Sequence, residues 1–358
     1  MRRVGHADLR LCTGPVPHYR QIVELGGALI EYMVDELGPS ETLRRFSHPI
    51  WFEAMASAMG FEWQFSGATT VTIRAISEAI QGKEENLGIR IVGGKGRDAR
   101  TADKVPEEIR EPDIVTTKVD SSLVQDGYDI YFHSVIYTEK GEWIVINQGM
   151  NTDERLARRY HWLWEDERFL NDAEEIAGRE EKRVLDLQTK ESAEARKTIL
   201  DIMHDESPKR IAYLILSLRR RPGQRTLADY GIDGVARVEY MPFTFRIPRR
   251  VNEEALRIAK DAQNFVELIK TPGIGPSTIR GLAFVASLVY GAPVSWKDPV
   301  KYTYAFGTKA GKPWMVEREE MVKAASFLRE AIEEAKTGDK TKKRALERLA
   351  RVVHKGVG

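Results

Sequence analysis

Residues 128–148 read YDIYFHSVIYTEKGEWIVINQ, and this stretch predicts a β-hairpin. Its first part, 128–138, is rich in Tyr, Ile, Phe and Val, which favour extended backbone. Residues 139–142 are polar and contain a glycine, as in the tight turns that join antiparallel strands, and residues 143–148 return with the same apolar composition. We therefore expect a β-sheet built around this hairpin.

The chain before the hairpin mixes helix and strand patterns. Apolar residues recur at helical spacing from residue 19 to residue 37, and Gly38-Pro39 ends that pattern. Shorter elements are predicted in the order helix 41–46, helix 49–59, helix 70–81, strand 89–92 and a glycine-rich segment at 93–96. This part of the chain is expected to be mixed α and β.

The chain after the hairpin is more highly charged. Its periodicity predicts helices at 153–163, 173–187, 193–204 and 208–218, an extended crossover at 238–247, and further helices from residue 252. We predict an α+β fold with two domains. A mixed α/β domain that contains the hairpin sheet covers residues 1–165, and an all-α domain covers residues 166–358.

The composition limits the class of protein. The 358 residues include 55 Lys and Arg against 54 Asp and Glu, a net charge of +1, so bulk charge predicts no partner. The single cysteine, Cys12, excludes an intrachain disulfide and a four-cysteine metal site. No apolar run reaches half of a bilayer span and no signal peptide is evident. We expect a cytoplasmic protein without a membrane anchor, and an oligomer is compatible with the sequence.

Residues 265–279 read FVELIKTPGIGPSTI and resemble a helix-hairpin-helix motif of DNA repair proteins. An apolar helix, a Pro-Gly-Ile-Gly turn and a second helix that begins with proline follow one another at the spacing of that motif. The two glycines let the backbone approach another chain closely. The resemblance implies that the N–H groups of Gly273, Gly275 and Ser277 contact DNA phosphates. Such contacts do not distinguish one base sequence from another.

Other basic and polar residues bear on this assignment. Lys270, directly before the turn, belongs to the predicted DNA-binding set. Thr271 and Ile279 depart from the common pattern, so an ordinary turn between two helices is the alternative. Residues 339–358 carry seven bases against two acids and predict a basic terminal helix, which is either a solvated end or a nucleic-acid contact.

Five short blocks are spread along the chain: Arg3-x-Gly5-x-Ala7-Asp8-Leu9, SGATT at 66–70, GGKG at 93–96, DSSLVQDGY at 120–128 and QGMN at 148–151. In these blocks the sequence resembles the prokaryotic family catalogued as domain of unknown function 763, over nearly its whole length. The resemblance implies that the blocks belong to one protein type. It brings no mechanism, so the chemistry must be argued from the residues.

A polar cluster is predicted at the end of the hairpin away from its turn. Strand alternation places Asp129, Tyr131 and His133 on one face of the first strand. His133 lies opposite Gln148 if the turn has two residues, and opposite Asn147 if it has three residues with a glycine bulge. In either register polar side chains converge beside the segment that precedes the first strand.

Carboxylates around this cluster suggest a divalent-metal site. Asp120, Asp126 and Asp129 are the predicted ligands of Mg²⁺ or Mn²⁺, which prefer oxygen and would activate water for phosphodiester cleavage. The predicted catalytic set is Asp120, Asp126, His133, Gln148 and Lys118, and Lys95 is predicted to contact DNA phosphate. The alternative is structural: Asp120 caps a short helix, Asp126 begins a turn, and His133 pairs with Gln148 across the strands.

The leading hypothesis is a metal-dependent DNA repair nuclease whose C-terminal domain grips the DNA backbone. One alternative is a monofunctional DNA glycosylase. Residues 290–298 resemble the catalytic segment of helix-hairpin-helix glycosylases, which implies Asp298 as the catalytic carboxylate, although Asp298-Pro299 is equally a capping or turn pair. A second alternative is a DNA-binding scaffold without catalytic activity.

Overall fold

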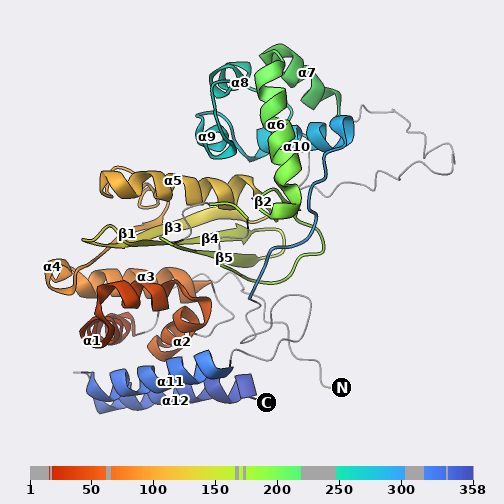
Figure 1. The fold of residues 1–358 in the computed structure, drawn as a ribbon. Helices are drawn as coiled ribbons and strands as arrows, with labels where there is room; N and C mark the ends of the chain where they lie inside the picture. Colours follow the sequence, from red (N-terminus) through yellow and green to blue (C-terminus); the bar gives the residue numbers. More distant parts are fainter. Residues whose placement is uncertain are drawn as a thin grey trace, which may run out of the picture.

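The structure is a computed structural model that describes residues 16, 18–61, 66–165, 169–171, 175–218, 247–302, 318–335 and 338–357. Its centre is a five-stranded antiparallel sheet in the order β1-β3-β4-β5-β6, with helices on both faces (Figure 1). The predicted α+β fold is therefore confirmed. Residues 238–246 of the predicted crossover at 238–247, the block at 3–9 and Cys12 lie outside the described residues.

The sheet is built around the predicted hairpin. Its strands are β1 Ile89–Lys95, β3 Asp129–Thr138, β4 Trp143–Asn151, β5 Leu156–Leu163 and β6 Glu175–Ala177. The N–H group of Thr138 donates to the carbonyl of Glu142, which closes a turn of three residues, 139–141, and Gly141 adopts a φ of 82°. His133 consequently pairs with Asn147, the second of the two predicted registers. A separate small ladder joins β2 Val124–Gln125 to β7 Leu185–Asp186.

The helices predicted at 153–163 and 173–187 are wrong, because these stretches hold β5, β6 and β7. In β5 the side chains of Arg158, Tyr160 and Trp162 face one side of the sheet, and Arg159 and His161 face the other. All five are buried. The charged residues that suggested a solvated helix are instead paired in the interior. Because successive side chains of a strand point to opposite faces, both faces of β5 carry buried residues.

Three helices cover one face of the sheet: α1 Tyr19–Ser47, α2 Pro49–Met59 and α3 Gly67–Ile80. They pack on Phe132 and Ile136 of β3 and on Ile144 and Ile146 of β4. The predicted break at Gly38 is a kink, with φ 77°, after which α1 continues over the predicted helix at 41–46. A short helix, α4 Glu84–Leu87, precedes β1.

Two C-terminal helices lie beneath this layer (Figure 1). They are α11 Arg318–Glu334 and α12 Asp339–Val357, and both contact α2. Ala345 and Leu349 of α12 are buried there, whereas Lys340, Lys343 and Arg344 are exposed. The basic terminal helix is thus present, docked by its apolar edge. Within the described residues no helix combines the length and apolar character needed to cross a bilayer.

Helix α5, Glu107–Ser122, covers the other face of the sheet (Figure 1). The sequence did not predict α5, because Pro112 lies within it and proline usually ends a helix. Asp120 therefore lies in the last turn of a long helix and does not cap a short one. The consequence for function is that α5 lies between the sheet and the remaining helices.

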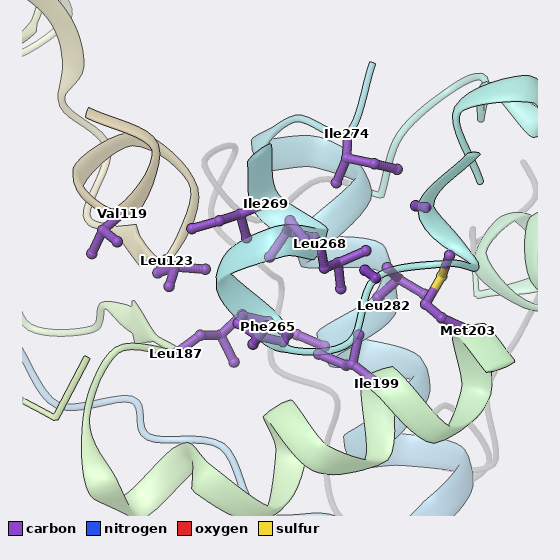
Figure 2. Close-up of a cluster of buried hydrophobic side chains, with 14 of the residues drawn as sticks. Val119, Leu123, Leu187, Ile199, Met203, Phe265, Leu268, Ile269, Ile274 and Leu282 are labelled. Atoms are coloured by element: carbon purple, nitrogen blue, oxygen red, sulfur yellow. The ribbon is translucent and has the colours of Figure 1, made fainter. Parts of the chain in front are cut away.

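Those remaining helices form a group above α5 (Figure 1). In chain order they are the 3₁₀ turn Lys190–Ser192, α6 Ala193–Asp205, α7 Pro208–Ser217, α8 Glu253–Ala259, α9 Phe265–Lys270 and α10 Pro276–Tyr290. Val119 and Leu123 share one apolar cluster with Ile269 of α9 and Leu282 of α10 (Figure 2). The α9–α10 pair is thereby held on α5.

Candidate functional site

The buried face of the sheet beneath α5 carries a polar network centred on His133. The Nε2 atom of His133 lies 2.5 Å from Asp113 Oδ1, and its Nδ1 atom lies 2.6 Å from Asn147 Oδ1. Thr101 Oγ1 donates to Asp113 and lies 2.8 Å from His133 Nε2. All four residues are buried. Both ring nitrogens of the imidazole thus face oxygen atoms.

The network continues from Asn147 to Asp120. Asn147 Nδ2 donates to Asp120 Oδ2 at 2.7 Å, and Trp162 Nε1 donates to the same carboxyl group at 3.0 Å. Burial raises the pKa of Asp120 to about 8, against the effect of these two hydrogen bonds, and the nearby charge of Asp126 adds to the rise. A continuous chain of hydrogen bonds therefore runs from Asp113 to Asp120.

The hydrogen bonds fix the orientation of the Asn147 amide. Its Nδ2 atom donates to Asp120 and its Oδ1 atom faces His133 Nδ1, which is therefore the donor in that contact. The geometry supports a structural network in which buried polar groups of α5, β3, β4 and β5 are bonded to one another.

A second buried cluster surrounds Asp126. Its carboxylate accepts hydrogen bonds from Arg158 Nη1 at 2.9 Å, Tyr160 Oη at 2.6 Å and the backbone N–H of Tyr128 at 3.0 Å. Burial raises the pKa of Asp126, although Arg158 opposes the rise. The bond to Tyr128 is the turn that the structural alternative predicted.

Arg158 links Asp126 to the C-terminal half of the chain. Its Nη2 atom donates to Asp298 Oδ2 at 2.6 Å, and Asp298 also accepts from the backbone N–H groups of Glu181 and Val300. The side chains of Asp126 and Asp298 are each 1% exposed and that of Arg158 is 0% exposed. Asp298 therefore forms the turn that was one reading of its Asp-Pro sequence, and its oxygens face partners within the protein.

The predicted metal ligands do not come together. Asp120 and Asp126 are held by the partners just described, and Asp129 is exposed at the start of β3. Among the described residues there is no group of three or more His, Cys, Asp or Glu side chains that could hold a metal ion. The ligand set Asp120, Asp126 and Asp129 is therefore not assembled in this structure.

A β-bulge explains why the predicted face of β3 is wrong. The register between β3 and β4 shifts between Ile130 and Phe132, so Tyr131 is an extra residue. Tyr131 thereby joins Gln148 on the face toward α3, where Gln148 Nε2 donates to Tyr131 Oη and, at 3.1 Å, to the carbonyl of Ser66. His133 faces α5 instead. Strand alternation cannot foresee a bulge. Gln148 lies on the opposite face from His133 because the register pairs His133 with Asn147 and Gln148 with Phe132.

The two predicted lysines lie outside both buried clusters. Lys118 is half-buried on α5. Lys95 is exposed at the end of β1, with its Nζ atom 5.5 Å from the centre of the Tyr131 ring. Neither lysine is hydrogen-bonded to Asp120 or Asp126 within the described part of the chain.

Sequence reasoning missed several residues of the network. Asp113, Trp162 and Arg158 were not proposed, and Asn147 entered only as an alternative partner of His133. A signal for Arg158 and Trp162 was the alternation of residues 156–163, which is that of a strand. Asp113 follows a proline in a helix that the sequence did not predict, and only the fold brings it to His133.

The turn between α9 and α10 has the geometry that its glycines require. Gly273 has a φ of +86°, and a Cβ atom there would lie 2.8 Å from the Cβ of Ala255, so glycine is needed for both conformation and space. Ile274 is buried, which fixes the turn in the core. Gly275 begins α10 with extended backbone, φ −125°, and no atom lies within 4 Å of the position that its Cβ would occupy.

The outer surface of this turn is accessible. Gly273 and Ser277 are exposed, and Gly275 is half-buried. Within the described residues the N–H groups of Gly273, Gly275 and Ser277 make no hydrogen bond to a backbone carbonyl. Ile279, which departs from the common pattern, is buried and packs with the core of the group. The turn thus presents bare amides beside open space.

Side chains of the N-terminal half hold this turn in place. Lys270 forms an ion pair with Glu111 of α5. Gln125 Nε2 donates to the carbonyl of Pro276 at 2.9 Å, and Arg280 Nε donates to Gln125 Oε1 at 2.5 Å. The segment that contains Asp126 therefore adjoins the first turn of α10.

Comparison with known proteins identifies a family for this chain. No curated protein and no solved structure matches this chain. The family described as protein of unknown function (DUF763) matches residues 5–316, which span the sheet, both buried clusters and the α9–α10 turn. The chain therefore belongs to the DUF763 family.

Proposed function

We propose that this protein binds the sugar–phosphate backbone of DNA through the turn between α9 and α10, and that the two helices act as a helix-hairpin-helix module. The observation that carries the proposal is the combination of bare amides at Gly275 and Ser277 with open space over Gly275. A phosphate oxygen can approach such amides without displacing a side chain. Contacts of this kind bind all DNA sequences alike.

The helix that follows the turn supports this proposal. α10 has 15 residues, and its N-terminal amides carry the positive end of the helix dipole. Pro276 at the first position removes a donor that would have no intrahelical partner. Together these features favour an anion at the turn over a neutral ligand.

The structure indicates which glycine of the turn to replace in a test of DNA binding. Replacement of Gly273 would strain the backbone and clash with Ala255, so loss of binding could reflect misfolding. Gly275→Val adds a side chain into open space and leaves the fold intact, while it blocks the approach of a phosphate. Loss of one charge-assisted hydrogen bond costs about 1.5–3 kcal/mol, so the dissociation constant should rise roughly 10- to 100-fold.

Fluorescence anisotropy with a labelled duplex and its single strand measures this effect. Ser326→Val, which adds the same side chain at an exposed position of α11, is the matched control and should bind like the wild type. Equal affinity of Gly275→Val and wild type for both DNA forms would reject the turn as the binding site.

Metal-dependent cleavage of DNA stays a prediction. Two of the three carboxylates that were expected to bind Mg²⁺ or Mn²⁺, those of Asp120 and Asp126, are occupied by protein partners, so we assign them no catalytic step. Incubation of labelled DNA with Mn²⁺, with and without EDTA, distinguishes the alternatives. Cleavage that EDTA abolishes supports a nuclease, metal-independent abasic sites support a glycosylase, and binding without turnover supports a scaffold, which is the role that the geometry favours.

A further inference from the structure

The outer face of α12 carries three exposed cations, Lys340, Lys343 and Arg344. Their spacing of three and four residues places them on one side of the helix. Asp339 and Glu347 lie within one helical turn of these cations, but within the described residues none of the three cations forms an ion pair. The positive charge of this face is therefore directed to solvent.

Other helices of the same chain compensate their exposed arginines. Helices α1, α3 and α8 each pair one arginine with a glutamate three or four residues away. These pairs are Arg20–Glu24, Arg74–Glu78 and Arg257–Glu254. Like charges at the spacing of Lys340 and Arg344 destabilise a helix by about 0.2–0.5 kcal/mol. A bound polyanion would remove this repulsion from α12.

The packing of α12 fixes which of its faces is exposed. Ala345 and Leu349 are buried in the apolar cluster beneath the sheet. Arg348 lies at the C-terminal end of α2, where a Cβ atom on Gly60 would come within 2.5 Å of its Nη1 atom. The helix dipole favours a cation at that end. With these side chains docked, the group of Lys340, Lys343 and Arg344 faces away from the protein.

This arrangement favours a nucleic acid over a membrane surface as the partner. A helix that binds a bilayer inserts its apolar face among the lipids, whereas the apolar edge of α12 is covered by protein. DNA needs only the cations, because its phosphates are bound through charge. Three exposed carboxylates, Glu330, Glu333 and Glu334, lie on α11, so the cationic surface is limited to α12.

The cations of α12 and the α9–α10 turn lie on opposite sides of the molecule (Figure 1). α12 packs on α2 beneath the sheet, and α9 packs on α5 above it. Four layer spacings separate α12 from α9, which amounts to roughly 40 Å. One straight duplex cannot contact both sides, so the two surfaces would bind two different segments of DNA.

We propose that Lys340, Lys343 and Arg344 of α12 bind the phosphate backbone of a second DNA segment, so that one molecule holds two segments together. The bridge rests on the proposed function of the α9–α10 turn, whereas the contact made by α12 does not. A protein with these two surfaces is a DNA scaffold.

A capture assay tests the bridge. One short duplex is immobilised, and a second, fluorescent duplex is retained only when the protein holds both. The triple variant Lys340→Gln, Lys343→Gln and Arg344→Gln should reduce retention roughly tenfold or more, since about three phosphate contacts are lost. Gly275→Val should reduce retention as well, because it removes the other surface.

A salt titration measures the contact of α12 separately. In the Gly275→Val background α12 is the remaining proposed DNA surface. Adding the triple substitution should there reduce the slope of log affinity against log salt by about 2.7, which is 0.9 for each of three phosphate contacts. An unchanged slope would refute the contact.

Two further variants serve as controls. Lys104→Gln, Lys140→Gln and Lys190→Gln together remove the same charge from scattered exposed positions and should retain the second duplex like the wild type. Lys340→Arg with Lys343→Arg keeps the charge of α12 and should also retain it. Equal losses in the scattered variant and the triple variant would show an effect of net charge alone and refute the assignment to α12.

The outcomes separate this inference from the proposed function. If Gly275→Val loses the second duplex and the triple variant keeps it, the turn binds DNA and the role of α12 is refuted. If Gly275→Val binds like the wild type and the triple variant does not, α12 binds DNA and the role of the turn is refuted. If the triple variant loses binding only to phosphatidylserine vesicles, α12 is a membrane contact and the proposal fails.

Discussion

The buried carboxyl group of Asp120 makes stability depend on pH. Its pKa rises from an ordinary value of 3.8 to about 8 in the folded protein, chiefly because burial penalises the charged form. Between these values the folded state holds a proton that the unfolded state has released. Stability therefore falls as pH rises from about 4 to about 8, by up to about 1.4 kcal/mol per pH unit for a single group.

Asp120→Asn isolates this effect. The amide has the shape of the neutral carboxyl group, so it can accept from Trp162 and donate to Asn147 after the Asn147 amide turns over. The variant has no ionisable group at residue 120, so its stability includes no cost for ionising a buried carboxyl group. Across three pH units, from about 5 to about 8, its stability should rise relative to the wild type by up to about 4 kcal/mol.

Urea unfolding followed by tryptophan fluorescence measures this difference, and Trp162 is one of the reporters. Asp103→Asn removes a charge from an exposed loop and controls for the global effect of one charge. A difference between Asp120→Asn and wild type that stays constant within about 1 kcal/mol over this range would show that Asp120 is ionised in the folded state, and would refute the reasoning.

Three further predictions concern the stability of the same elements. Gly273→Ala should lower the free energy of unfolding by about 1–3 kcal/mol, because alanine is strained at φ +86° and meets Ala255; an unchanged urea midpoint would contradict this. Asp298→Ala should cost about 3–5 kcal/mol, because it leaves Arg158 buried with one carboxylate fewer; calorimetry should show the loss, and a cost below 1 kcal/mol would contradict it. His133→Leu should cost about 2–3 kcal/mol, because Asp113 and Asn147 lose a buried partner; a stability in urea equal to that of wild type would contradict it.

Local sequence was sufficient wherever a turn decides the structure. The hairpin register follows from the three-residue loop with Gly141, which the sequence offered as one of two possibilities. The α9–α10 turn was predicted because its glycines and prolines act within a few residues of one another. In both places the conformation depends on the residues of the turn and little on distant contacts.

Prediction failed where distant residues determine the environment. Residues 156–163 look like a solvated helix by composition, but their arginines are neutralised by Asp126, Asp298 and Glu53, which come from distant parts of the chain. The bulge at Tyr131 places Tyr131 and His133 on opposite faces, and no local pattern marks it. The candidate metal site was derived from both errors, so the fold was more predictable than the site.

The position of the buried network suggests why so many polar groups are retained beneath α5. The hydrogen bond from His133 to Asn147 forms only in the observed β3–β4 register, and the bonds to Asp113 and Asp120 form only when α5 lies at the observed height over these strands. Apolar packing alone tolerates small shifts of a helix over a sheet. Here a shift of α5 or of the β3–β4 register would leave a buried polar group unpaired. Because α9 packs on α5 and Gln125 holds α10, a fixed α5 also fixes the α9–α10 turn. We infer that the network holds the α9–α10 turn, whose amides we propose to contact DNA, in a constant place over α5, a role that needs neither a metal ion nor catalysis.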